Sequence, residues 1–178
     1  MTPASPRADF CDLYNQSVER VYRYLLARTG SAAEAEDLTA ETFHAALAGY
    51  ERLRESQPPL PWLLGIARHK LADHLRRGWW RGRRRSVPLD ALPELELPGP
   101  SIEDQAGLRL DVARVVRALG ALNAERAEAV ALRYFAGLDL DEVAQAMGKS
   151  DEAAKKLVQR GLAELRQRLG VEREERPA

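Results

Sequence analysis

Apolar residues recur at steps of three and four along most of this chain, and that spacing predicts helices because one helical turn takes about 3.6 residues. No segment shows the sustained alternation of apolar and polar residues that a half-buried strand requires. The first predicted helix carries an apolar stripe that ends at Gly30, and its members are Tyr14, Val18, Val21, Tyr22 and Leu25. We therefore expect an all-α protein.

A second helix is predicted immediately downstream. Ser31 and Glu34 have the spacing of a capping box, in which two side chains satisfy backbone N–H groups at a helix start. The helical period places three acids, Glu36, Asp37 and Glu41, away from the buried side. The buried side is expected to comprise Ala35, Leu38, Thr42, Phe43 and Ala46.

A third helix is predicted to start in the proline cluster at residues 58–61, because proline is tolerated in the first helical turn. Its charge is opposite to that of the preceding helix. Residues 31–53 are rich in acids, whereas residues 61–85 are rich in arginine and contain tryptophans. This reversal predicts a carboxylate surface for one partner and a cationic, aromatic surface for another, with nucleic acid as the candidate for the second. The expected buried stripe is Leu63, Ile66, Ala67, Leu71 and Leu75.

Between residues 78 and 100 the helical period is lost, and prolines and glycines recur at short intervals. We interpret this segment as a linker between a first domain at residues 1–77 and a second at residues 101–178. A flexible linker of this length spans about 25–30 Å root-mean-square and about 80 Å fully extended, so it does not fix the distance between the domains. The chain has 27 acidic and 27 basic residues, and we expect attraction between these surfaces to fold the two domains together in the free protein.

The second domain is predicted to begin with two helices. The first covers residues 102–119. The second is capped by Asn123, carries Tyr134 on its apolar side, and stops at Gly137.

A helix-turn-helix motif is predicted to follow. Asp139 and Glu142 have capping-box spacing at the start of a short helix, Gly148 permits the turn, and Ser150 caps a longer helix. In such a motif the N-terminal half of the second helix enters the major groove of DNA. The residues expected there, outside the apolar stripe, are Ala153, Lys155, Lys156, Gln159 and Arg160.

Composition narrows the function further. The formal net charge of this 178-residue chain is +0, so affinity for phosphate must come from local clusters. The single cysteine, Cys11, excludes an intramolecular disulfide, and with the three histidines it lacks the spacing of a zinc site, so no metal or cofactor is expected. No nucleophile–base constellation indicates an enzyme. Without a membrane-spanning apolar run or a signal core, we expect a cytoplasmic protein with no membrane insertion.

Each signal also has a plainer interpretation. Helix-turn-helix spacing occurs in other helical hairpins, and an acidic helix surface is often only solvated. Trp62, at a helix start, fits core packing at least as well as base stacking. The arginines at 81 and 83–85 fit either a solubilising segment or nonspecific phosphate contact.

Two motifs that follow each other along the chain support the interpretation as a protein that binds DNA and a protein partner. Residues 34–47 (EAEDLTAETFHAAL) and 61–77 (PWLLGIARHKLADHLRR) resemble region 2 of bacterial sigma factors of the sigma-70 family, and residues 122–169 resemble region 4. Their order, with no region 3 domain between them, resembles the extracytoplasmic-function group. The resemblance implies a non-enzymatic alternative sigma factor that directs core RNA polymerase to promoters. It also implies two small helical domains, a region 2 bundle and a region 4 helix-turn-helix.

The resemblance assigns a role to each surface. The implied partners are core RNA polymerase (the clamp coiled coil of its largest subunit and its flap region), promoter DNA and an anti-sigma factor. The acidic helix would dock on the clamp through Asp37, Leu38, Glu41, Thr42 and Phe43. The next helix would recognise and open the minus-ten element through Trp62, Arg68, His69, Lys70, Asp73, His74, Arg76 and Arg77. The last long helix would read the minus-thirty-five element through Ser150, Ala153, Lys155, Lys156, Gln159 and Arg160.

Two departures from the family pattern fall where DNA would be contacted. His69 stands where many relatives have asparagine, and Glu152-Ala153-Ala154 replaces a common glycine-threonine-valine start. A promoter sequence therefore does not carry over from relatives. The alternatives are a stand-alone helix-turn-helix regulator that binds a palindrome as a dimer, and a helical scaffold that binds no DNA.

Overall fold

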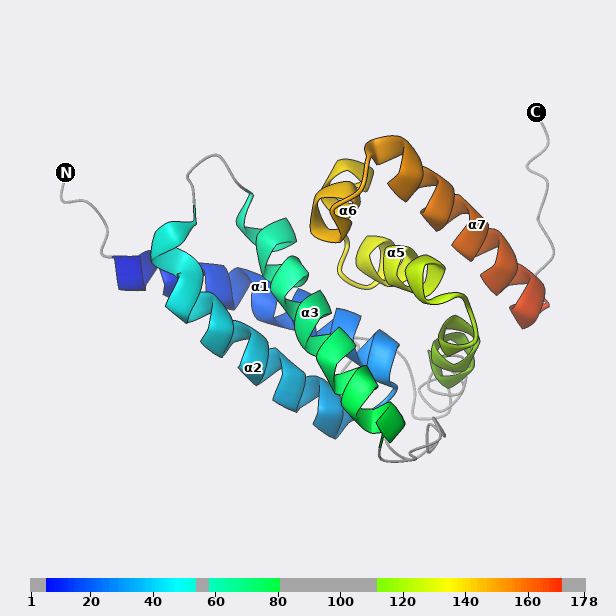
Figure 1. The fold of residues 1–178 in the computed structure, drawn as a ribbon, viewed down its shortest axis with the longest axis horizontal. Coiled ribbons are helices and arrows are strands. Elements are labelled where there is room, and N and C mark those ends of the chain that lie inside the picture. Colours follow the sequence, from blue (N-terminus) through cyan, green and yellow to red (C-terminus); the bar gives the residue numbers. More distant parts are fainter. Residues whose placement is uncertain (1–5, 54–57, 81–111, 171–178) are drawn as a thin grey trace, which may run out of the picture.

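The computed structural model describes residues 6–53, 58–80 and 112–170, and these residues contain helices and no strand (Figure 1). The all-helical prediction is confirmed. In addition to residues 112–120, which are helical, the elements are α1 (Pro6–Thr29), α2 (Ala32–Gly49), the 3-10 turn η1 (Tyr50–Arg52), α3 (Pro59–Trp80), α5 (Ala124–Tyr134), α6 (Leu140–Met147) and α7 (Asp151–Leu169).

The first three helices form one bundle (Figure 1). α1 ends where Gly30 adopts a left-handed backbone, with φ of 70°, and its N–H donates to the carbonyl of Leu26. Ser31 then caps α2, because its Oγ accepts a hydrogen bond from the N–H of Glu34 at 3.4 Å. The predicted buried residues of α2 are all buried. The largest fully buried side chains of this bundle are Val21, Tyr24, Leu25, Leu38, Leu63, Leu64 and Leu71.

The second group of helices contains the predicted helix-turn-helix. Asp139 and Glu142 form the reciprocal capping box of α6, and Gly148 ends that helix with a left-handed φ of 63°. Ser150 caps α7 by accepting a hydrogen bond from the N–H of Ala153 at 3.3 Å. α6 and α7 both pack on α5. The turn follows from local sequence, since each cap and the glycine lie at the predicted position.

Close packing of α5 on α7 depends on Gly161, which is buried. A Cβ at this position would lie 2.7 Å from Cγ2 of Val130 and 3.0 Å from the carbonyl oxygen of Arg126. We expect Gly161→Ala to lower the free energy of unfolding by about 1–2 kcal/mol, because overpacking outweighs the gain of about 1 kcal/mol in helix propensity. Gly120→Ala is the matched control, since its Cβ would meet nothing within 4 Å. Denaturant unfolding measures both, and equal stability of the two variants contradicts the expectation.

The two groups of helices pack against each other and share one hydrophobic core. α1 contacts α5 and α3 contacts α6, as Figure 1 shows for the second pair. The prediction that the two groups fold together is confirmed. Among the described residues, arginines of α1 and α3 form ion pairs with a buried acid of α5 across this interface.

Two details differ from the sequence-based expectation, and one part of it is not described. α3 continues to Trp80, so the predicted domain end at residue 77 lies inside a helix; an isolated glycine such as Gly78 costs a helix only about 1 kcal/mol. Tyr134 is 55% exposed and does not belong to the buried side of α5. The linker from residue 81 onward, its arginine cluster and residues 102–111 lie outside the described residues.

Candidate polymerase and nucleic-acid interfaces

The predicted docking residues of α2 differ in their exposure. Asp37 and Glu41 are exposed. Leu38, Thr42 and Phe43 are only 2%, 0% and 6% exposed, because they lie on the side of α2 that packs into the bundle. In this conformation these three side chains pack into the bundle and position the helix, and their direct contact with a partner stays a prediction.

The acidic and basic surfaces of the first bundle are neighbours. Oε2 of Glu41 lies 3.8 Å from Nζ of Lys70, and Oε2 of Glu34 lies 3.3 Å from Nε2 of His74. These pairs join α2 to α3 along their exposed edge. Asp37 makes no ion pair within the described part of the chain, so its carboxylate is available to a partner.

Half of the predicted minus-ten residues are exposed on α3, and the others are partly buried. His69, Asp73, Arg76 and Arg77 are exposed, whereas Lys70 and His74 are half-buried by the pairs with α2. Asp73 accepts a hydrogen bond from Arg76, and this bond is the main reason that the pKa of Asp73 is lowered from its ordinary value. Asp73 thus stays ionised and partly neutralises the cationic surface beside it.

Trp62 lies at the first turn of α3, half-buried against the core. A Cβ on Gly49 would lie 3.6 Å from Cζ2 of this indole, so the ring packs against the end of α2. Trp62 is therefore partly exposed and partly packed.

Arg68 is the member of the predicted minus-ten set that faces the second group of helices. Its Nε lies 3.7 Å from Oε1 of Glu128 on α5. The same carboxylate accepts a hydrogen bond from the hydroxyl of Tyr24 at 2.5 Å and lies 3.6 Å from Arg28. Burial and the neighbouring Glu128 charge raise the pKa of Tyr24 well above its ordinary range. The hydroxyl therefore stays protonated and donates a hydrogen bond to Glu128.

The predicted minus-thirty-five residues share the outer face of α7. Lys155, Lys156, Gln159 and Arg160 are exposed, and Ala153 is half-buried. Nζ of Lys156 forms an ion pair with Glu152 at 2.5 Å, whereas Lys155 and Arg160 make no ion pair within the described residues. Ser150 is exposed as the cap of α7. The structure thus brings these residues together on one surface, near the N-terminus of the helix.

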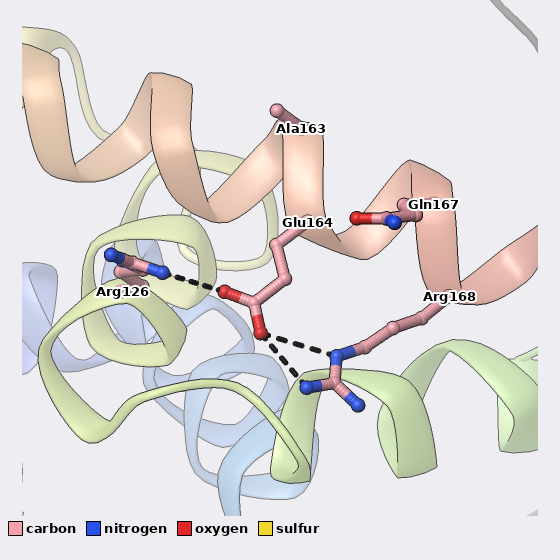
Figure 2. Close-up of a pocket in the computed structure, with 5 residues that line it drawn as sticks. All are labelled: Arg126, Ala163, Glu164, Gln167 and Arg168. Carbon is pink, nitrogen blue, oxygen red and sulfur yellow. Dashed lines mark hydrogen bonds and ion pairs between the residues drawn. The ribbon is translucent and has the colours of Figure 1, made fainter.

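A shallow hollow between α5 and α7 offers no anion site. Figure 2 shows Glu164 between Arg126 and Arg168, at 2.8 Å and 2.9 Å from their nearest guanidinium nitrogens. The hydrogen bonds from Arg168 and Arg126 lower the pKa of Glu164. Both guanidinium groups are therefore engaged by one carboxylate.

Sequence reasoning missed the residues that join the two groups of helices. Glu128 and Arg28 are buried charges. A second arginine, Arg20, donates from Nε to the carbonyl of Ala136 at 2.6 Å and from a terminal nitrogen to that of Gly137 at 2.7 Å. One feature of the sequence could have pointed to Glu128. It is a charged residue within the apolar stripe of α5, next to Ala127 and two residues before Val130.

The described residues contain neither a cluster of three metal-ligating side chains nor a helix long and apolar enough to cross a membrane.

Two family models match the chain. Sigma-70 region 2 matches residues 13–81, and Sigma-70, region 4 matches residues 113–165. Among solved structures, the chain is similar to CnrH, in a complex with the cytosolic domain of CnrY (TM-score 0.70, 22% identity, 94% of this chain and 91% of that chain). It is also similar to RpoE of Bartonella quintana, in a complex with the anti-sigma factor NepR (TM-score 0.75, 20% identity, 93% and 99%). These two structures establish the likeness of fold.

Sequence relatives define the group. The chain is 36% identical to the ECF RNA polymerase sigma factor BldN of Streptomyces coelicolor over 88% of its own length, and it spans 58% of BldN. It is 34% identical to the ECF RNA polymerase sigma factor SigD of Mycobacterium tuberculosis, over 82% of this chain and 70% of SigD. SigL of the same organism is 29% identical over 90% of both chains. The chain therefore belongs to the sigma-70 family of RNA polymerase sigma factors, in the extracytoplasmic-function group.

Proposed function

We propose that this chain is an alternative sigma factor that binds core RNA polymerase and directs promoter recognition, DNA opening and transcription initiation. The observation that carries this proposal is the presence in one chain of both sigma modules, each with its surface exposed. The acids Asp37 and Glu41 of α2 form the proposed docking face for polymerase. The cations of α3 and the outer face of α7 form the proposed DNA surfaces. The polymerase, not this chain, makes the phosphodiester bonds, so we assign the chain no catalytic role.

The proposed domains are the region 2 bundle and the region 4 helix-turn-helix, with the intervening segment as linker. An anti-sigma factor is a further proposed partner, because the similar chains CnrH and RpoE were solved with CnrY and NepR bound. A cytoplasmic location follows from a role on core polymerase and chromosomal DNA.

Run-off transcription tests the function. Purified chain, core polymerase and genomic promoter fragments should give transcripts that core polymerase alone does not produce, from sites with two separated elements. A dimeric regulator would instead bind a palindrome without polymerase, and a scaffold would bind no DNA in either setting. Absence of chain-dependent transcripts together with palindrome binding would favour the regulator.

Trp62→Ala should impair transcription from a duplex promoter more than from a template already mismatched at the minus-ten element. The reason is that a partly exposed indole can hold an unstacked base, at about 1–3 kcal/mol per stacked base, and this offsets the cost of opening. The unfolding midpoint serves as the control for lost packing against the end of α2. Equal defects on the two templates would show that Trp62 acts through packing alone.

A further inference from the structure

Two consecutive residues in the first turn of α5 hold the last helix at two separate points. Oε1 of Glu125 lies 2.7 Å from Nζ of Lys149, in the turn that leads into α7. A terminal nitrogen of Arg126 donates a hydrogen bond to Oε2 of Glu164, in the C-terminal half of α7, at 2.8 Å (Figure 2). In the first pair α5 supplies the acid, and in the second it supplies the base. α7 is thus tied to α5 on both sides of its middle.

Between these two points α7 lies directly against α5. A Cβ at Gly161 would lie 3.0 Å from the carbonyl oxygen of Arg126 and 3.3 Å from its Cβ, so Arg126 packs on the backbone of α7 while its guanidinium reaches Glu164. The buried residues of α7 are Ala154, Val158, Gly161 and Leu165. Two of these four have no side chain beyond Cβ, and helices resist rotation against each other through interdigitated side chains. The apolar contact by itself therefore fixes the angle of α7 only weakly.

A small rotation at this crossing matters for DNA recognition. Ser150 lies eleven residues before Gly161, or about 16 Å along the helix, so a tilt of about 5° at Gly161 moves the start of α7 by about 1.4 Å. Hydrogen bonds to base edges weaken steeply with such a change in distance or angle. The attraction between a cation and a phosphate falls much more slowly with distance. A tilted α7 thus loses sequence discrimination before it loses affinity for DNA.

The two ion pairs contribute more to geometry than to stability. The side chains of Glu125 and Arg126 are 59% and 37% exposed, and pairs so open to water stabilise a fold only slightly. Both acids nevertheless stay charged. The hydrogen bond from Lys149 lowers the pKa of Glu125, and those from Arg168 and Arg126 lower the pKa of Glu164. Both connections therefore persist at neutral pH.

We propose that Glu125 and Arg126 are positioning residues for α7: through Lys149 and Glu164 they set the angle at which this helix meets the minus-thirty-five element, without touching DNA themselves. This inference rests on the proposed function. Two points fix the axis of a helix, whereas loss of either pair leaves α7 held at one point and free to tilt about Gly161.

Variants of the full chain separate positioning from simple electrostatic attraction. Arg126→Met removes a cation but keeps the aliphatic stem on Gly161, and Glu164→Gln removes an acid with little change in shape. If these residues acted only through the field of the domain, the first change would weaken DNA binding and the second would strengthen it. Positioning predicts that both changes lower the preference for the correct sequence. It also predicts that the double variant is no worse than either single variant, since both remove the same contact.

Glu125→Gln tests the second point of attachment in the same way. The matched control is Asp141→Asn, which removes an acid from an exposed position of α6. Asp141 makes no ion pair within the described part of the chain. It is therefore expected to change the charge of the domain without releasing α7.

The first readout is the ratio of two affinities of the holoenzyme. One probe is a promoter fragment that gives chain-dependent run-off transcripts, and the other is the same fragment with its upstream element scrambled. We expect Arg126→Met, Glu164→Gln and Glu125→Gln each to lower this ratio about 5–10-fold, with the affinity for the scrambled fragment changed about twofold or less. Asp141→Asn should keep the ratio of the unaltered chain. Circular dichroism identifies a variant that fails to fold, and the remaining variants then decide.

The second readout needs no DNA. Residual dipolar couplings of the backbone amides in the full chain report the angle between α5 and α7, and we expect a change of about 5° or more in the variants of either pair and none in Asp141→Asn. Unchanged couplings, or opposite effects of Arg126→Met and Glu164→Gln on the affinity ratio, overturn the positioning role. Altered couplings in variants of a chain that supports no transcription with core polymerase would refute the proposed function and leave the positioning of α7 standing.

Discussion

Reversing two of the exposed charges of α2, with Asp37→Lys and Glu41→Lys together, should abolish co-purification of the chain with core RNA polymerase. Like charges placed opposite each other in an interface cost several kcal/mol, and the double reversal changes the local charge by four units. Helix content should stay nearly unchanged. Within the described residues, the ion pair lost is that of Glu41 with Lys70, in which both side chains are partly exposed, and such pairs contribute about 1 kcal/mol or less.

The matched control for this reversal is Asp12→Lys with Glu19→Lys. It produces the same change in net charge on exposed positions of α1. Retained binding by the α2 variant, or equal loss in the α1 control, would show that the docking surface is misplaced or that only the overall charge matters.

Removing the two unpaired cations of the proposed recognition surface of α7, with Lys155→Ala and Arg160→Ala, should weaken binding of the minus-thirty-five duplex by holoenzyme about 10–100-fold. Each phosphate contact releases about one counterion, so the slope of log affinity against log salt should fall by about two if both residues contact phosphate. If Arg160 reads a base edge instead, specificity relaxes at one position and the slope falls by about one. The pair is more informative than Lys156, because Lys156 is already engaged with Glu152.

The control for the α7 variant is Arg117→Ala with Arg166→Ala. Both arginines are exposed and lie outside the proposed recognition surface, and their replacement by alanine removes the same charge as the α7 variant. Equal weakening in the control would mean that only the general field of the domain attracts DNA. Fluorescence anisotropy over a range of salt concentrations measures affinity and slope together.

Local structure was predictable because its causes are local. The caps Ser31, Asn123 and Ser150 each accept the hydrogen bond expected of them, and Gly30 and Gly148 adopt the left-handed backbone that their positions require. The exposure of Asp37, Glu41, Lys155 and Arg160 likewise follows from the helical period.

The site was predicted less completely, since a family motif mixes residues that contact a partner with residues that hold the helix in place. Leu38, Thr42 and Phe43 illustrate this, because they lie within the same motif as the two acids but face the core. Trp62 shows the same ambiguity in a single side chain, which packs against the bundle and stays partly exposed. Burial separates these roles, and burial depends on packing between helices.

The sequence by itself determined the helices, their caps, the helix-turn-helix and the two charged surfaces, because each depends on residues within a few turns of one another. Only the tertiary structure decided how the two modules meet. Tyr24 and Glu128 are separated by 104 positions, yet their side chains lie 2.5 Å apart, and Arg68 reaches the same carboxylate from a third helix. A period or a cap cannot encode such a contact, because it depends on the fit of two finished surfaces and on the cost of burying a charge without partners.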